Sequence, residues 1–257
     1  MRRPNGSTPE LAELRAVIFD VDGTLVDTER IGHRKAFNAA FAEHGLEYYW
    51  DESTYVRLLA ITGGRRRIES FLVERNHPGE KASLARALHV RKTVLFMEWV
   101  ASADVQARPG VHDLLDRLEA AGVTLAVCTT GTGEWVHPLL DRVFGRGRFQ
   151  AVVTGDDVVE LKPEPDAYLL ALARLQLRAD QAVAVEDSRN GFVAARRAGL
   201  ECWVITNDYT ADQRFDGALG VYSSFTDARQ ALTASRMFAA SIPADSRLRS
   251  SRLGQLR

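Results

Sequence analysis

The chain has 257 residues, of which 46% are hydrophobic and 26% are charged, and its net charge is −1 at pH 7. This composition is typical of a globular protein with a buried core, and the near-neutral charge favours neither nucleic acid nor a membrane surface as a partner. Two cysteines are too few for a disulfide framework, and no apolar run approaches the roughly 20 residues that cross a bilayer. We therefore expect a cytoplasmic monomer that binds neither nucleic acid nor membranes.

The first structural signal is the apolar run at residues 16–19, which predicts a short buried strand. It is followed by Asp20 and Asp22, with one apolar residue between them, and Gly23 permits a tight turn. Two carboxylates this close oppose each other's ionisation when buried, and a cation with oxygen ligands, such as Mg²⁺, removes that cost. The alternative is an acidic turn with no ligand.

The next 75 residues have helical periodicity and no strand-like alternation. They form a helical unit inserted directly after the first strand. The expected helices span 29–45, 52–61, 65–74 and 82–100.

From about residue 105 onwards, helices and strands alternate. Expected strands at 124–129, 151–154, 182–185 and 202–206 are separated by expected helices at 111–121, 135–144, 166–175 and 191–198. This alternation predicts an α/β fold, a parallel sheet with helices on both faces. Because the strands are parallel, their carboxyl ends share one edge, where ligands bind in such sheets.

Polar side chains follow several of these strands. The first strand ends in Asp20, the second in Thr129 and Thr130, and the fourth in Glu186 and Asp187. Lys162 comes shortly after the third strand. Carboxylates, hydroxyls and an ammonium group are thus expected together at one edge, and this set fits phosphoryl transfer.

In such a reaction Asp20 serves as a covalent nucleophile that accepts the phosphoryl group. Asp22 protonates the leaving oxygen and later activates water. Thr129 donates a hydrogen bond to a phosphoryl oxygen, and Lys162 neutralises charge. The predicted Mg²⁺ ligands are Asp20, Asp22 through its backbone carbonyl, Glu186 and Asp187.

The string F-D-V-D-G-T-L-V-D-T closely resembles the first motif of the haloacid dehalogenase (HAD) superfamily. Thr129, Lys162 in L-K-P-E-P-D and Asp187 in V-E-D-S stand where the other three motifs lie, so the resemblance covers about residues 16–225. It implies a Rossmann-like core at 14–26 and 107–232, an all-helical cap domain at 27–106, and tails at 1–13 and 233–257. The tails are expected to be flexible.

A narrower resemblance is to the CbbY-type sugar-phosphate phosphatases within the β-phosphoglucomutase-like subfamily, carried by D-T-E, G-H-R, T-G-G-R and R-P-G. Arg65 stands where those enzymes usually have lysine. The resemblance implies a cap that moves about hinges at 26–28 and 105–110. The residues assigned to substrate binding are Glu29, His33, Arg65, Arg67 and Thr130. Each of these assignments has an alternative without substrate contact. His33 could pack within the cap, Glu29 could be a charge at a helix end, and the arginines could be exposed to solvent. Trp50, Tyr48 and Tyr49 are assigned to the cap core.

The sequence therefore predicts a Mg²⁺-dependent phosphatase acting on a small sugar phosphate, with xylulose-1,5-bisphosphate as the substrate that the narrower resemblance implies. Asp22 argues against carbon–halogen chemistry, because dehalogenases of the superfamily lack an aspartate there. Two alternatives remain: a mutase of the β-phosphoglucomutase type, which shares the motifs, and a non-catalytic protein that retains the fold.

Overall fold

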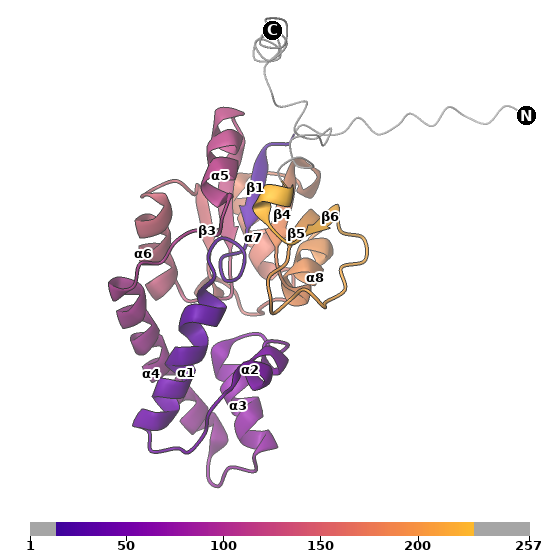
Figure 1. Ribbon diagram of the computed structural model, residues 1–257. Helices are drawn as coiled ribbons and strands as arrows, with labels where there is room; N and C mark the ends of the chain where they lie inside the picture. The colour runs from indigo at the N-terminus through magenta and orange to yellow at the C-terminus, as the bar shows by residue number, and fades with distance from the viewer. Residues whose placement is uncertain (1–13, 229–257) are drawn as a thin grey trace, which may run out of the picture.

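The structure is a computed structural model that describes residues 14–228. The predicted tails lie outside these residues, as do residues 229–232 of the predicted core domain. A sheet flanked by helices forms one part of the molecule, and a helical unit lies beyond one edge of that sheet (Figure 1). No helix within residues 14–228 combines the length and the apolarity needed to cross a membrane.

The sheet within the described residues has six strands in the order β3-β2-β1-β4-β5-β6, and every pairing is parallel. The strands are β1 (Ala16–Phe19), β2 (Thr124–Cys128), β3 (Ala151–Val153), β4 (Ala182–Glu186), β5 (Glu201–Ile205) and β6 (Gly220–Tyr222). The α/β prediction is confirmed, and β6 is an additional strand that the sequence pattern did not indicate. The order of the strands reverses beside β1, which places a ligand site beyond the carboxyl ends of β1 and β4.

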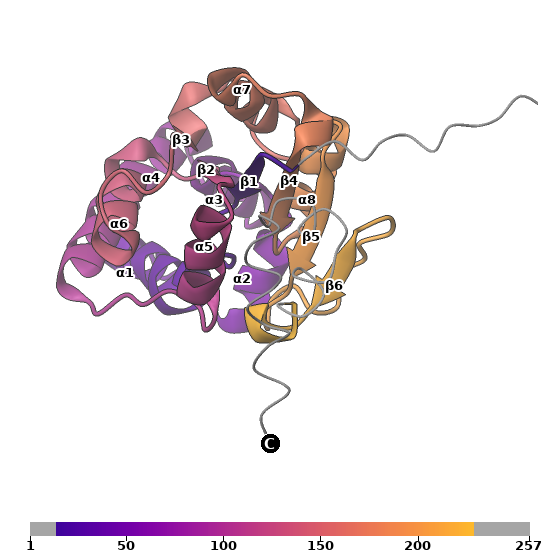
Figure 2. The same ribbon diagram turned by 90° about the horizontal axis from the view of Figure 1, so that it is seen from above.

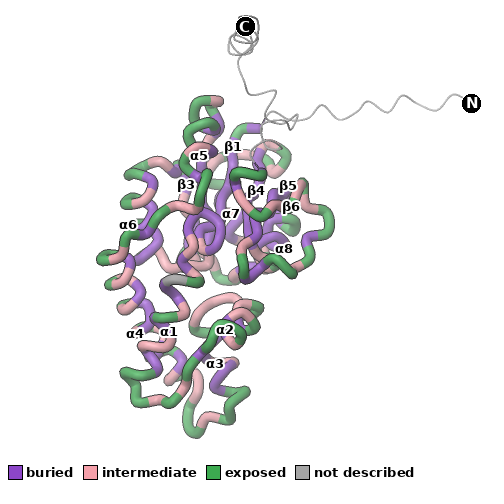
Figure 3. Tube along the Cα trace, in the orientation of Figure 1, coloured by how far each residue is buried: buried purple, intermediate pink, exposed green. Residues whose placement is uncertain are grey.

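Helices cover both faces of the sheet, as predicted. Val17 and Phe19 of β1 join one buried cluster, whereas Ala16 and Ile18 join the cluster on the opposite face. The first cluster includes α5 (Val111–Ala120) and α6 (Gly133–Phe144), and the second includes α7 (Asp166–Leu175) and α8 (Arg189–Arg197). Figure 2 shows α5 and α7 on opposite sides of the strands. Because both faces are covered, β1 and β4 are buried at every residue (Figure 3).

The inserted residues form the helical unit. Its helices are α1 (Arg34–Glu43), α2 (Glu52–Leu58), α3 (Gly64–Glu74) and α4 (Lys81–Ser102). The single helix expected at 29–45 is instead a π-helical turn at Glu29–His33 that continues into α1. Such turns are found frequently at functional sites because the wider winding changes where side chains point.

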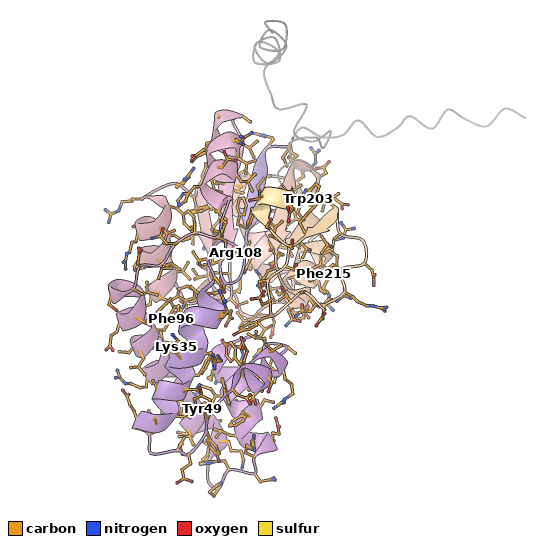
Figure 4. The ribbon with its side chains drawn as sticks, viewed as in Figure 1. Lys35, Tyr49, Phe96, Arg108, Trp203 and Phe215 are labelled. Carbon is orange, nitrogen blue, oxygen red and sulfur yellow. The ribbon has the colours of Figure 1, made fainter. Side chains whose placement is uncertain are left out.

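An aromatic cluster holds the helical unit together. Phe41, Trp50, Tyr55 and Phe71 are each at most 1% exposed. The Trp50 ring is tilted or edge-on to the other three at centroid distances of 5.0–6.1 Å, and Phe41 stacks on Phe71 at 6.2 Å. This geometry is favourable for aromatic pairs. The assignment of Trp50 to the core is confirmed, whereas that of Tyr49 is wrong. Tyr49 is 68% exposed on the part of the helical unit remote from the sheet (Figure 4).

The chain crosses between the two units twice, and the crossings lie side by side. Val26 forms isolated bridges with both Asp22 and Ala107. The Arg108 guanidinium then donates to the carbonyls of Gly23 and Thr206, which ties the loop after β1 to the loop after β5. Arg108 lies at the boundary between the sheet and the helical unit (Figure 4). Both segments predicted to act as hinges are therefore part of one narrow connection.

Replacing Phe41 by alanine should lower the free energy of unfolding by about 3–5 kcal/mol, because it leaves a cavity among Trp50 and Phe71. Val73 is 57% exposed on the same unit, so Val73→Ala is the matched control and should change stability by about 0.5 kcal/mol or less. Urea unfolding followed by circular dichroism gives both values. Equal losses in the two variants would contradict the aromatic core.

Candidate active site

A cluster of buried carboxylates lies at the carboxyl ends of β1 and β4. The register pairs Phe19 with Val185, so the next residues, Asp20 and Glu186, lie side by side. Asp187 completes the group, and one carboxylate oxygen from each residue lies within 4.8 Å of the other two. We call Asp20, Glu186 and Asp187 the carboxylate cluster. Within the described residues this is the group of acidic, histidine or cysteine side chains arranged to hold a metal ion.

Lys162 joins the carboxylate cluster from the loop before α7. Its ammonium group donates to Asp20 Oδ1 at 2.7 Å, to Glu186 Oε1 at 2.6 Å and to the carbonyl of Cys128 at 2.8 Å. Burial alone would lower the pKa of Lys162, but the charges of Asp20 and Glu186 raise it above its usual value. Lys162 is therefore a cation at neutral pH, with all three of its donors used.

The two aspartates of the cluster carry strongly shifted pKa values. Burial raises the pKa of Asp20, although Lys162 opposes this effect. Burial and the charge of Glu186 raise the pKa of Asp187 to about 8, against a hydrogen bond from Asn207 at 2.7 Å. The cause in both is the cost of holding several carboxylates together away from water.

The cluster fits a divalent cation in charge and in donor chemistry. If all three carboxylates are ionised, as they would be around a cation, the ammonium group of Lys162 leaves two negative charges for that cation to balance. Glu186 Oε1 accepts from both Lys162 and Tyr168, while its Oε2 atom is buried and has no hydrogen-bond partner among residues 14–228. An unpartnered buried carboxylate oxygen is costly unless something binds it. Hard oxygen donors of this kind suit Mg²⁺.

Asp22 points to a different set of partners, supplied by the helical unit. Its Oδ1 atom accepts from Thr28 and lies 3.1 Å from His33 Nε2. His33 stacks on Phe96, and its Nδ1 atom lies 2.8 Å from Lys92 Nζ. Burial would raise the pKa of Asp22, but His33 and Thr28 lower it. The Asp22 side chain is thus held as a carboxylate beside the cluster rather than within it.

The two threonines after β2 have different surroundings. Thr129 is buried, and its hydroxyl accepts from the backbone N–H of Gly131 at 3.1 Å. Thr130 lines the cavity above the carboxylate cluster. The hydroxyl that the motif assigns to the site is therefore held by a backbone group, and its neighbour faces the cavity.

Two connected lobes of about 290 and 340 Å³ form the cavity between the sheet edge and the helical unit. The core lobe includes Asp20, Lys162 and Asp187 among its lining residues. The cap lobe is lined mainly by the helical unit and is rich in basic side chains. The lobes share Asp22, Glu29, Gly63, Arg67 and Thr130. Basic residues opposite a carboxylate cluster suit an anionic ligand with a second charged group.

The predicted cap residues all line this cavity, but in different ways. Tyr55 accepts from Arg67 at 3.2 Å and donates to Glu29, so a buried chain of polar groups joins these three side chains. Arg67 is buried, and His33 is occupied by Asp22. Arg65 is exposed in the cap lobe, and no side chain or backbone group of residues 14–228 forms a hydrogen bond or ion pair with its guanidinium group.

Sequence reasoning missed several side chains of the site, chiefly Lys92, Tyr55 and Asn207. Lys92 gave a detectable signal. It lies on the buried stripe of α4 between Leu88 and Phe96, where a charged residue is rare without a partner. Asn207 follows β5 in a loop without periodicity, so no sequence pattern indicated its role.

Comparison with known proteins gives consistent matches. The family model of haloacid dehalogenase-like hydrolases matches residues 14–199. The protein CbbY of Cereibacter sphaeroides is 43% identical over 218 residues, which cover 83% of this chain and 94% of that protein.

Solved structures agree. A CbbY mutant from Rhodobacter sphaeroides in complex with xylulose-1,5-bisphosphate superposes with a TM-score of 0.77 and 41% identity, over 83% of this chain and 96% of that one. A putative β-phosphoglucomutase from Thermotoga maritima has a TM-score of 0.64 and 25% identity, over 86% and 99%.

The shifted pKa of Asp187 predicts how stability depends on pH and Mg²⁺. Between about pH 4 and 8, and without a cation, Asp187 keeps its proton in the folded protein but has lost it in the unfolded chain. The free energy of unfolding should therefore fall as pH rises through this range. Mg²⁺ at about 100 times its dissociation constant should restore about 2.7 kcal/mol, most visibly at pH 8. Thermal unfolding at pH 5–8, with Mg²⁺ or with EDTA, measures this.

Asp187→Asn should reduce this pH dependence, leaving the part due to Asp20, and should remove the effect of Mg²⁺. Asp180→Asn is the control, because Asp180 lies on the surface and pairs with Arg178, and it should behave as the parent protein does. An Asp187→Asn variant that Mg²⁺ still stabilises to the parent's extent would contradict the assignment of the metal site.

Proposed function

This chain belongs to the haloacid dehalogenase-like hydrolase family, and on that premise we propose that it removes phosphate from xylulose-1,5-bisphosphate through an aspartyl-phosphate intermediate. It is a CbbY-like sugar-phosphate phosphatase, a phosphoric monoester hydrolase. The observation that carries the proposal is Asp20, held by Lys162 beside two further carboxylates at the base of a cavity whose other end is basic.

In the first step Asp20 attacks phosphorus, and the bond between phosphorus and the sugar oxygen breaks. This step needs Asp22 in its protonated form, so the carboxylate must first take up a proton, which the nearby anionic phosphate of the ester favours. Asp22 then gives that proton to the leaving oxygen, and the sugar departs as an alcohol. The Lys162 ammonium group offsets charge on Asp20 and on the phosphoryl oxygens. Thr129 or Thr130 supplies a hydroxyl donor from the adjacent strand end.

In the second step Asp22 accepts a proton from water, and the oxygen attacks the aspartyl-phosphate. The bond between Asp20 and phosphorus breaks, which releases inorganic phosphate and restores the carboxylate. The lowered pKa of Asp22 favours the ionised form that this step needs. Its contacts with Thr28 and His33 keep the carboxylate oriented.

Asp20, Asp187, Glu186 and the backbone carbonyl of Asp22 would hold the Mg²⁺ ion. When bound, Mg²⁺ neutralises charge on the transferring phosphoryl group. The free Oε2 atom of Glu186 supports direct ligation by this residue. Tyr168 and Lys162 both donate to Oε1, so Oε1 would anchor the Glu186 side chain and Oε2 would bind the cation.

We assign recognition of the rest of the substrate to residues 27–106, the cap domain, and the chemistry to the core domain at 14–26 and 107–232. Arg65 and Arg67 are placed to attract a distal phosphate. Glu29 and Thr130 line both lobes and so border the space between them, where sugar hydroxyls would lie, while His33 lines the cap lobe.

The direct test is a phosphate-release screen with Mg²⁺ across sugar mono- and bisphosphates. Xylulose-1,5-bisphosphate should give the highest kcat/KM, and Asp20→Asn should lower kcat at least about 10⁴-fold because the nucleophile is lost. The parent protein in EDTA is the control for metal dependence. Silence of the parent protein on every ester would refute the proposal.

A mutase gives a different result in the same screen. Incubation with β-glucose 1-phosphate and a trace of glucose 1,6-bisphosphate would yield glucose 6-phosphate faster than inorganic phosphate. We expect inorganic phosphate to be the main product from every active substrate.

The role of Arg65 predicts a difference between substrates. Arg65→Ala should raise KM for a sugar bisphosphate about tenfold or more, because a charge-assisted hydrogen bond is lost, and should leave KM for a monophosphate within about twofold. Arg65→Lys keeps the charge and should recover part of the loss. Arg57→Ala, which removes an exposed arginine paired with Glu74, is the control. Equal effects of Arg65→Ala on both substrates would contradict a distal phosphate at this position.

A further inference from the structure

The first turn of α8 forms hydrogen bonds with the helical unit through the side chain of Asn190. Asn190 Nδ2 donates to the carbonyl of Ala60 at 3.1 Å and to Thr62 Oγ1 at 2.9 Å. Both acceptors belong to residues 59–63, which we call the α2–α3 turn. Asn190 lies three residues after Asp187, so this contact begins beside the carboxylate cluster.

The contact lies across the cavity from the apolar connection between the units. On the other side, Phe96 of α4 packs edge-on against Trp135 of α6 with centroids 5.1 Å apart. Figure 1 shows α4 running toward α6, while α2 and α3 lie below α8. On the side of the Phe96–Trp135 contact, Arg142 of α6 also donates to backbone carbonyls at and just after the end of α4. On the side with Asn190, Tyr209 of the loop after β5 packs edge-on against Tyr55 of α2 with centroids 6.3 Å apart.

The α2–α3 turn forms part of the cavity wall. Leu59, Ala60, Thr62 and Gly63 line the core lobe together with Asn190. Gly63 has a φ of +89°, and a Cβ atom there would lie 3.0 Å from Leu161 Cδ1, next to Lys162. The turn is thus fitted closely against the core, and it leads directly into Gly64 and Arg67 of α3.

We propose that Asn190 is a positioning residue that fastens the α2–α3 turn over the core lobe and so sets the affinity for the sugar phosphate. This inference rests on the proposed function, because it assigns Asn190 to the binding of that substrate. Both bonds of Asn190 join neutral groups and are partly open to water. When the units separate, water replaces each acceptor at small cost, so the contact is reversible.

A second contact on the same side is too weak to replace this one. Arg66 pairs with Glu160 at 3.4 Å, but both side chains are about half exposed. Exposed pairs of this kind contribute little. The Tyr209 ring packs against α2, so among the described residues Asn190 is the core side chain that hydrogen-bonds the α2–α3 turn itself.

The experiment compares Asn190→Ala, Thr62→Val and the double variant. Asn190→Ala should raise KM for xylulose-1,5-bisphosphate about tenfold, the effect of losing one to two net hydrogen bonds, with kcat within about twofold. Thr62→Val should raise KM less, and the double variant should match Asn190→Ala because the Thr62 hydroxyl acts through Asn190. Arg57→Ala is the control, since Arg57 bonds only within the helical unit among its described contacts.

Hydrogen exchange supplies a readout that needs no turnover. Amides of residues 59–66 should exchange about tenfold faster in Asn190→Ala than in the parent protein without substrate, while amides of β1 and β4 keep their rates and the unfolding temperature stays within about 3 °C. Unchanged exchange at 59–66, or unchanged KM, would overturn the proposal. A parent protein inactive on every ester would refute the proposed function, and the exchange result would still decide whether Asn190 holds the turn.

Discussion

The site depends on one buried ammonium group. Lys162 donates to two carboxylates and one carbonyl that come from three neighbouring strands. A buried cation is tolerated only when its donors are used, and buried carboxylates only when a cation is near. The strands must therefore end at the same level, and the parallel register of β2, β1 and β4 provides this alignment. The alignment of the strand ends therefore also balances the charges of the site.

The remaining negative charge determines what else the site can accept. Asp187 and Glu186 Oε2 are not neutralised by Lys162, and the raised pKa values of Asp20 and Asp187 express that imbalance. A divalent cation would neutralise the two remaining negative charges, and a phosphate ester could then bind beside the cation and Lys162. The basic side chains of the cap lobe lie at the other end of the cavity, so a ligand with two anionic ends experiences attraction at both.

The α/β core could be predicted from the sequence because its strands are short apolar runs that end in polar or charged side chains. Asp20, Lys162, Glu186 and Asp187 were predicted to meet, and the structure brings them together. The helical unit was harder. Its periodicity indicated helices but not how they pack, so Tyr49 was placed in a core that it does not enter.

Contacts between the units were beyond prediction for a related reason. His33 reaches Asp22 only because a π-helical turn replaces the start of the expected α-helix. Asn190 of the core bonds a residue of the helical unit 128 positions away in the chain, and within the helical unit Lys92 lies beside His33, 59 positions away. No local sequence pattern encodes such a pairing, because it depends on how distant segments pack.

The surroundings of Asp22 have a consequence for how such enzymes diversify. The carboxylate cluster is built wholly from the sheet, so a chimaera carrying a foreign helical insertion would inherit it intact. Asp22 is the exception, since its imidazole and hydroxyl neighbours, His33 and Thr28, come from the insertion. A transplanted insertion must therefore bring its own groups to steady this carboxylate, and exchange of substrate preference between such proteins is constrained at this one junction.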